Sequence, residues 1–123
     1  MRFEPAPDIK RKINSILDIV KFKHIDRKRI ICMRGHGSKS NALARIWGLS
    51  RIWQKAFGIE SYYIIEVLHP TFDELSKEDQ EKTLLHELLH VPKKFSGGLV
   101  PHKCFGKRID RRTVDKLYNK YFK

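Results

Sequence analysis

The segment SKEDQEKTLLHELLHVP, residues 76–92, constrains the fold more than any other part of the chain. Ser76 with Asp79 three residues later resembles a helix capping box, and Pro92 marks the other end of the predicted helix. Two adjacent apolar strips cover most of this helix; their residues are Leu84, Leu85, Leu88, Leu89 and Val91. Because apolar side chains point in several directions, we expect the rest of the chain to pack around this helix.

Three other segments have the composition of strands. Residues 30–33 form a short apolar run that ends at a glycine-containing turn or loop. Residues 62–67, YYIIEV, form the clearest strand, and Pro70 closes it. The segment 42–49, ALARIWGL, is compatible with a further strand. The chain therefore combines strands with helices.

Three helices are predicted besides the central one. After a loose start that ends at Pro7, residues 8–22 place isoleucine, leucine and valine at helical spacing. Residues 50–58 begin with a serine N-cap candidate and end with a glycine, which predicts a short helix. Residues 110–123 predict a basic amphipathic helix at the C-terminus. Its expected buried side chains are Val114, Leu117, Tyr118 and Tyr121.

The length and composition describe one folded domain. With 123 residues, 41% of them hydrophobic and 33% charged, the chain can form a core without disulfide bonds. We expect a single domain over residues 1–123. Cys32 and Cys104 are too few to define a disulfide framework, although one of them could bind a metal. No apolar run has the length of a membrane span and no secretory signal is visible, so we expect a cytoplasmic protein without a membrane partner.

The charge is strongly positive and concentrated towards the C-terminal end. The net charge is +12, and residues 91–123 carry ten lysines and arginines against Asp110 and Asp115. Such a field attracts nucleic acid, ribosomes or anionic membranes non-specifically, and it can equally serve solubility. We expect non-specific contact of the basic C-terminal segment with nucleic acid as a possible property.

His86, Glu87 and His90 form an HExxH motif on the central predicted helix. Residues four apart lie on one helix face, so the two imidazoles can bind one ion at roughly 2.0–2.1 Å. Glu87 lies one residue round from His86, where its carboxylate can reach a water on the ion. These polar groups on a mostly buried helix are costly unless they are paired or bind a metal. We therefore expect Zn²⁺ as the cofactor.

A third ligand must come from elsewhere, because a catalytic zinc site has three protein ligands and one open position for water. The chain has no glutamate after Glu87, which disfavours a site completed by a later glutamate. The remaining candidates are His102, Cys104, Asp110 and Asp115. His102 stands twelve residues after His90, beyond a loop in which Gly97 and Gly98 can turn the chain back, and we take it as the third ligand.

Four stretches, TLLHELLHVP, FSGGLVPH, ARIWGLSRIWQKA and YYIIEV, give the chain a family resemblance. Together they resemble the putative phage metallopeptidase family, small zincin-like proteins of archaea, bacteria and their viruses. The resemblance covers most of the chain, from about Arg29 to His102. It implies an α+β fold, a compact zincin-like domain with a small mixed sheet, an active-site helix and flanking N- and C-terminal helices. More distantly, the chain is similar to SprT-like zincins, some of which degrade proteins crosslinked to DNA, but it lacks their longer histidine pattern after the helix.

The resemblance also implies zinc bound by His86, His90 and His102, with Glu87 as the general base. These residues suit zinc-dependent peptide hydrolysis, in which Glu87 accepts a proton from a zinc-activated water and passes it to the leaving amine. In the implied fold the strand 62–67 would lie at the edge of the sheet, where an extended peptide substrate can pair with it. An oxyanion partner is not assignable among His36, Tyr63 and His69.

Other readings remain open. Cys104 could join His86, His90 and His102 in a closed structural zinc site of a nucleic-acid-associated protein. It could instead occupy the water position reversibly and silence the enzyme. The chain could also be a DNA-associated SprT-like protease, or a basic binding protein whose C-terminal segment contacts phosphates.

Overall fold

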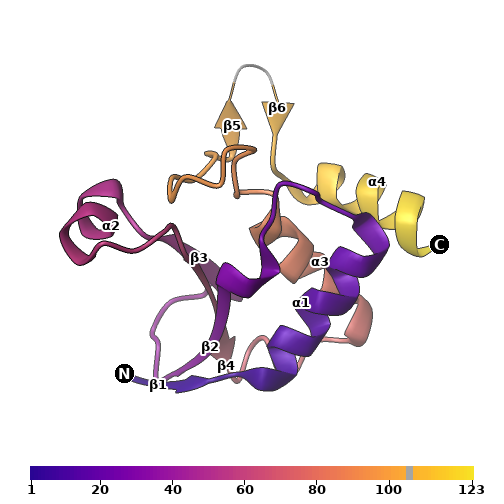
Figure 1. Ribbon diagram of the computed structural model, residues 1–123. Coiled ribbons are helices and arrows are strands. Elements are labelled where there is room, and N and C mark those ends of the chain that lie inside the picture. The colour runs from indigo at the N-terminus through magenta and orange to yellow at the C-terminus, as the bar shows by residue number, and fades with distance from the viewer. Residues whose placement is uncertain (105–106) are drawn as a thin grey trace.

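The computed structural model of the chain describes residues 1–104 and 107–123, without the side chains of residues 103, 104 and 107. Figure 1 shows helices packed on one side of a small sheet, with a short helix and a hairpin projecting from the body of the molecule. The elements in chain order are β1 (Arg2–Pro5), α1 (Pro7–Val20), a 3₁₀ turn (Arg27–Arg29), β2 (Ile30–His36), β3 (Ala44–Gly48), α2 (Arg51–Phe57), β4 (Tyr63–His69), α3 (Lys77–Leu88), β5 (Lys103–Cys104), β6 (Lys107–Arg108) and α4 (Arg111–Phe122). The fold is therefore α+β, as expected.

The main sheet is mixed, with strand order β1-β2-β4-β3. β4 pairs in parallel with β2 and antiparallel with β3, while β1 pairs antiparallel with β2. The prediction that the strand 62–67 lies at the edge of the sheet is wrong, because β4 has a neighbour on each side. The edge strands are β1 and β3. Burial explains the difference, since β4 buries Tyr63, Ile65 and Val67 on one face and Glu66 and Leu68 on the other, as a central strand does.

The core lies between the sheet and the helices α1, α3 and α4 (Figure 1). Successive side chains of a strand point to opposite faces, so Ile30 and Cys32 of β2 face the helices together with Ile65 of β4. α3 contributes Leu84, Leu85 and Leu88, each with no exposed surface. The prediction that the chain packs around α3 is confirmed.

The boundaries of several elements differ from the sequence predictions. The start of the chain is not loose, because Arg2–Pro5 pairs with β2. β2 continues past residue 33 to His36, where Gly37 adopts a positive φ of 83° and turns the chain. Ser76 caps α3 by accepting a hydrogen bond from the backbone N–H of Asp79, as predicted.

α3 ends at Leu88 rather than at Pro92, so His90 lies in the turn that follows the helix. In α4, Val114 and Tyr118 are buried as predicted, whereas Tyr121 is exposed and the prediction for it is wrong. Tyr118 stacks on Phe122 instead, which leaves Tyr121 on the solvent side of the helix.

Candidate metal centre

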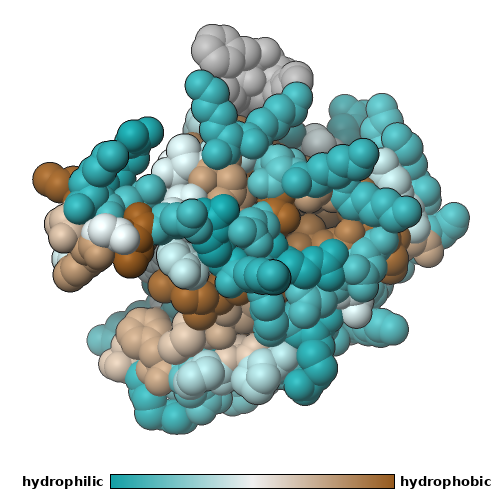
Figure 2. Space-filling model, viewed as in Figure 1, coloured by the Kyte–Doolittle hydropathy of each residue, from teal (hydrophilic) through white to brown (hydrophobic). Residues whose placement is uncertain are grey.

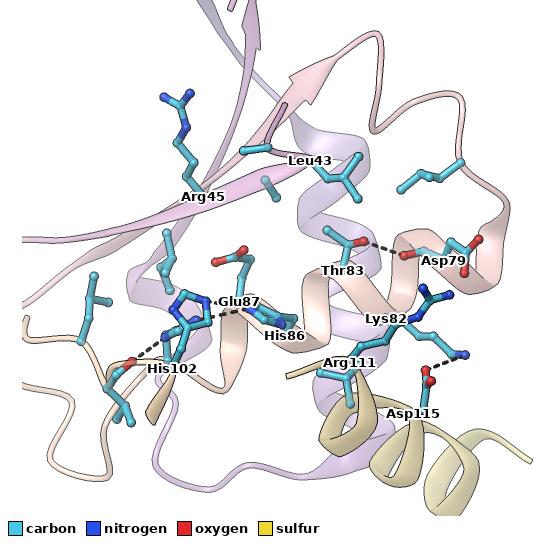
Figure 3. Close-up of a pocket in the computed structure, with 18 of the residues that line it drawn as sticks. Leu43, Arg45, Asp79, Lys82, Thr83, His86, Glu87, His102, Arg111 and Asp115 are labelled. Carbon is cyan, nitrogen blue, oxygen red and sulfur yellow. Dashed lines mark hydrogen bonds and ion pairs between the residues drawn. The ribbon is translucent and has the colours of Figure 1, made fainter. Parts of the chain in front are cut away.

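A cleft of about 900 Å³ separates the edge strand β3 from α3. Its walls are residues 42–46 on one side, α3 and the turn after it on the other, over residues 79–90, and the segment 99–102 with the first turns of α4 at its ends. The lining is mostly apolar, apart from the histidines and charged side chains drawn in Figure 3.

His86 and His90 keep the geometry expected of HExxH although α3 ends between them. The backbone N–H of His90 donates to the carbonyl oxygen of Glu87 at 3.1 Å, a tighter turn than in an α-helix. His86 is half-buried and His90 is buried. Their Nε2 atoms lie 3.4 Å apart.

The segment 91–102 returns to the histidines because Val100 bonds twice to His90. The backbone N–H of Val100 donates to the carbonyl oxygen of His90 at 2.7 Å, and His90 Nδ1 donates to the carbonyl oxygen of Val100. The second bond places the proton of the neutral imidazole on Nδ1. The lone pair of Nε2 therefore faces the cleft, as metal ligands require.

Tyr63 anchors the same segment to the sheet. Its hydroxyl accepts from the backbone N–H of Gly97 at 2.8 Å and donates to the carbonyl oxygen of Gly98 at 2.7 Å. Gly97 has a φ of +97°, and a Cβ there would lie 2.0 Å from the carbonyl oxygen of Leu49. Glycine is thus required at this position, and the predicted turn at Gly97 and Gly98 is present.

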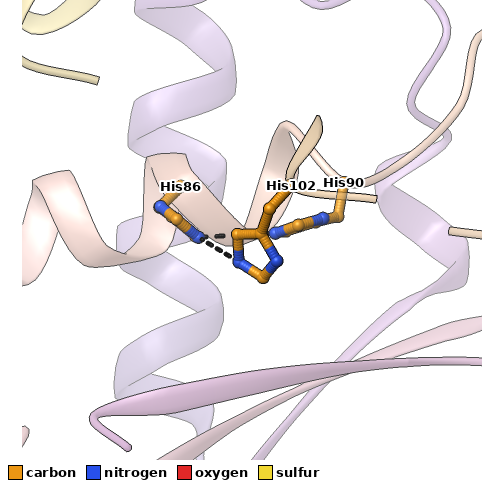
Figure 4. A group of neighbouring side chains, drawn as sticks. All are labelled: His86, His90 and His102. Carbon is orange, nitrogen blue, oxygen red and sulfur yellow. Dashed lines mark hydrogen bonds between the residues drawn. The ribbon is translucent and has the colours of Figure 1, made fainter. Parts of the chain in front are cut away.

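His102 completes a group of three imidazoles, as Figure 4 shows. The Nε2 atoms of His86 and His102 are 3.3 Å apart, and one nitrogen from each of the three rings lies within 4.8 Å of the others. Tetrahedral coordination with metal–nitrogen bonds of about 2.0–2.1 Å puts two ligand nitrogens about 3.3–3.4 Å apart. The three histidines therefore fit a zinc-sized ion.

The protonation of two of these histidines suits metal binding. Burial lowers the pKa of His86, and the neighbouring His90 and His102 lower it further. Burial also lowers the pKa of His90, while its bond to Val100 acts in the opposite direction. Both shifts favour the neutral imidazole, which is the form that binds a metal.

Glu87 points from α3 towards β3, beside the imidazoles of His86 and His102 (Figure 3). Its side chain is buried, and burial raises the pKa of the Glu87 carboxyl to about 7. A carboxyl group with a pKa near neutrality can both accept and donate a proton under physiological conditions.

The other candidate ligands have separate roles or are not described. Asp110 caps α4 by accepting from the backbone N–H of Thr113, and Asp115 forms an ion pair with Lys82 at 2.9 Å. The side chain of Cys104 lies outside the described residues. Cys32 is a free thiol buried in the core.

The oxyanion candidates named from the sequence do not line the cleft. Tyr63 holds the segment 91–102, His69 Nδ1 contacts Asp73 at 2.7 Å, and His36 lies beside Glu4. The sequence did not predict the hydrogen bond between His90 and the carbonyl oxygen of Val100, because every residue type has a backbone carbonyl group. It also placed the cleft beside β4, whereas the cleft lies beside β3.

Comparison with known proteins gives a family but no individual relative. No curated protein and no solved structure matches the chain. In the part of the chain that the structure describes, every helix is too short or too polar to cross a membrane. The sequence profile of the family described as Putative phage metallopeptidase matches residues 1–121. Three histidines in its cleft lie close enough to hold a metal ion, and the profile covers nearly the whole sequence, so the chain belongs to the putative phage metallopeptidase family.

Proposed function

We propose that the protein is a zinc-dependent peptidase in which His86, His90 and His102 hold the metal and Glu87 is the general base. The observation that carries the proposal is the spacing of the Nε2 atoms: that of His86 lies 3.3 Å from that of His102 and 3.4 Å from that of His90. The buried carboxyl group of Glu87, the glutamate of the HExxH motif, lies next to them. Three protein ligands leave one coordination position for water, the arrangement of a catalytic site.

When bound, zinc would polarise the carbonyl group of the substrate and acidify a water molecule. Glu87 then accepts the proton of that water at a carboxylate oxygen and passes it to the nitrogen of the leaving amine. The buried position of Glu87 supports this double role, since a carboxyl group fully exposed to water would stay ionised at neutral pH.

The free edge of β3 supports an extended peptide as the substrate. Along a strand of an antiparallel pair, every second residue directs its N–H and C=O groups to the neighbouring strand. The residues between them direct these groups away from it. Leu43 and Leu49 bond to β4, because Leu68 N–H donates to the Leu43 carbonyl and Leu49 N–H donates to the Tyr62 carbonyl. The alternation leaves the backbone groups of Ala44 and Ile46 pointing outwards along the cleft.

The backbone of a substrate can therefore pair with Ala44 and Ile46 while its side chains enter the cleft. This replaces β4, the strand expected from the sequence, with β3.

A Glu87→Gln variant tests the assignment. We expect it to retain one zinc ion per chain but to cleave unfolded casein about a hundred-fold to ten-thousand-fold more slowly than the unmodified protein. Glu74→Gln is the matched control, because Glu74 is exposed and outside the cleft. Undiminished cleavage by Glu87→Gln, or an unmodified protein that binds no zinc, would refute the proposal.

A further inference from the structure

α2 exposes its apolar side chains and turns a polar one inward, the reverse of an ordinary surface helix. Gln54 is its inward-facing residue, and its side-chain amide donates to the carbonyl oxygens of Leu49 at 2.7 Å and Ser96 at 2.9 Å. The apolar side chains face away from the protein. Ile52 is 76% exposed, Phe57 62% and Trp53 54%.

These side chains form an apolar knob, defined here as Ile52, Trp53, Phe57 and the neighbouring Ile59, which is also exposed. In Figure 1 α2 projects from the sheet, and in Figure 2 brown and tan side chains gather at this projection. Contiguous exposed apolar surface of this kind marks an interaction site, because water disfavours it. The knob shares no residue with the cleft beside α3.

A second feature, a pocket of about 390 Å³, adjoins the knob, since Ile59 belongs to both. Its other lining residues are the cations Arg51, Lys55 and Lys94, together with Gln54, Ser61, Phe95 and Ser96. Among the side chains that the structure describes, no carboxylate lies within ion-pair distance of the three cations. The nearest acidic residue in sequence, Glu60, pairs with Arg29. The pocket therefore suits an anion such as a phosphate group.

In place of the expectation of no membrane partner, we propose that the knob and the basic pocket together form a docking surface for an anionic lipid bilayer. Trp, Phe and Ile suit insertion among acyl chains at the membrane interface, while Lys and Arg beside them meet the phosphate groups of the lipids. The net charge of +12 adds long-range attraction to such a surface. The knob needs an apolar partner and the adjacent pocket needs an anion. An anionic bilayer supplies both, and it does not need a groove shaped to fit the knob.

Single-stranded nucleic acid fits the same surface less well. Successive bases stack on open aromatic faces, but Trp53 and Phe57 pack against each other, with ring centres 5.5 Å apart, so each ring keeps at most one face open and the knob has no further aromatic side chain. Ile52, the most exposed of the large apolar side chains, offers nothing to a base.

Co-sedimentation with vesicles tests the proposal. We expect the full chain to sediment with vesicles of phosphatidylcholine and phosphatidylglycerol, and to stay in solution with phosphatidylcholine alone. Ile52→Ser with Phe57→Ser should weaken this binding on the order of ten-fold or more, because the inserted apolar area is lost. The matched control is Ile19→Ser with Ile31→Ser, two exposed isoleucines on other elements.

The charge contribution has its own pair of variants. The double variant Lys55→Glu with Lys94→Glu should weaken binding by at least roughly five-fold per cation removed. The control is the double variant Lys39→Glu with Lys120→Glu, which changes two exposed lysines elsewhere and gives the same net charge. The control should keep most of the binding. This pair does not depend on the folding of the knob variant. Three outcomes overturn the proposal: no binding to anionic vesicles, equal losses in test and control pairs, or knob-dependent binding of a single-stranded oligonucleotide without vesicle binding.

Discussion

The carbonyl group of Val100 determines which nitrogen of His90 faces the cleft, and the hydroxyl of Tyr63 determines where Val100 can lie. Both position the group of three histidines through a single hydrogen-bonded segment, residues 91–102. From the sequence, spacing alone made His86 and His90 candidate ligands, and the loop with Gly97 and Gly98 pointed to His102 as the third candidate. The anchoring by Tyr63 could not be predicted, because a buried tyrosine on a strand looks like any other core residue until its partners are known.

Replacing Tyr63 by phenylalanine should weaken both the fold and the metal centre. The variant leaves the N–H of Gly97 and the carbonyl of Gly98 without their partner; Gly98 is exposed and water can replace the hydroxyl there, but Gly97 is buried. We expect a loss of about 1–3 kcal/mol in the free energy of unfolding, together with a lower affinity for zinc. Urea unfolding without metal and zinc competition with a chelating dye measure the two effects.

Tyr62→Phe is the control for this variant, since Tyr62 is the adjacent tyrosine and its hydroxyl makes no hydrogen bond to a described residue. If Tyr63→Phe unfolds and binds zinc just as Tyr62→Phe does, the anchoring role of Tyr63 is wrong.

At the scale of elements, Arg34 of β2 ties the beginning of α1 to the connection between β4 and α3. Its guanidinium donates to both carboxylate oxygens of Asp8, at 3.2 and 2.8 Å, and to both of Asp73, at 3.1 and 3.0 Å. The hydrogen bonds from Arg34 hold the pKa of the Asp8 carboxyl below its ordinary value of 3.8. The connection that leads into α3 is thereby fixed against α1.

This arrangement predicts a specific dependence of stability on pH. Because the pKa of Asp8 is lower in the folded than in the unfolded state, its contribution is fully present above about pH 4 and is lost as the pH falls through the folded pKa. Arg34→Met should lower the free energy of unfolding at pH 7, and the difference from the unmodified protein should shrink below pH 4. Urea titrations across this range measure it.

Arg11→Met serves as the control for this effect, because Arg11 is exposed and forms no ion pair with a described side chain. A difference between Arg34→Met and the unmodified protein that stays constant down to pH 2 would contradict the linkage to Asp8.

The elements also show which features of the fold sequence patterns can and cannot predict. The type and approximate position of α1, α3, α4, β2 and β4 follow from periodicity and capping. Whether a strand is central or at the edge depends on its partners, so the apolar run of β4 was compatible with either place. The direction in which α2 turns its apolar residues depends on Gln54 reaching Ser96, a contact between distant parts of the chain.

At the scale of the whole molecule, the sheet carries its helices on one face and the cleft at its free β3 edge (Figure 1). One cluster of buried residues runs from Ala6 to Tyr118, which favours the single domain expected for residues 1–123. The cleft lies on one side of this core and the apolar knob of α2 on a separate projection, so the proposed hydrolysis and the proposed membrane contact use different surfaces.

The central claim is an open zinc site with three histidine ligands, and X-ray absorption spectroscopy of the zinc-loaded protein tests it most directly. Three nitrogen neighbours and one oxygen neighbour, all at about 2.0–2.1 Å, are the predicted result for His86, His90, His102 and a water molecule. A sulfur neighbour at about 2.3 Å would contradict the account, because it would mean that a cysteine closes the site.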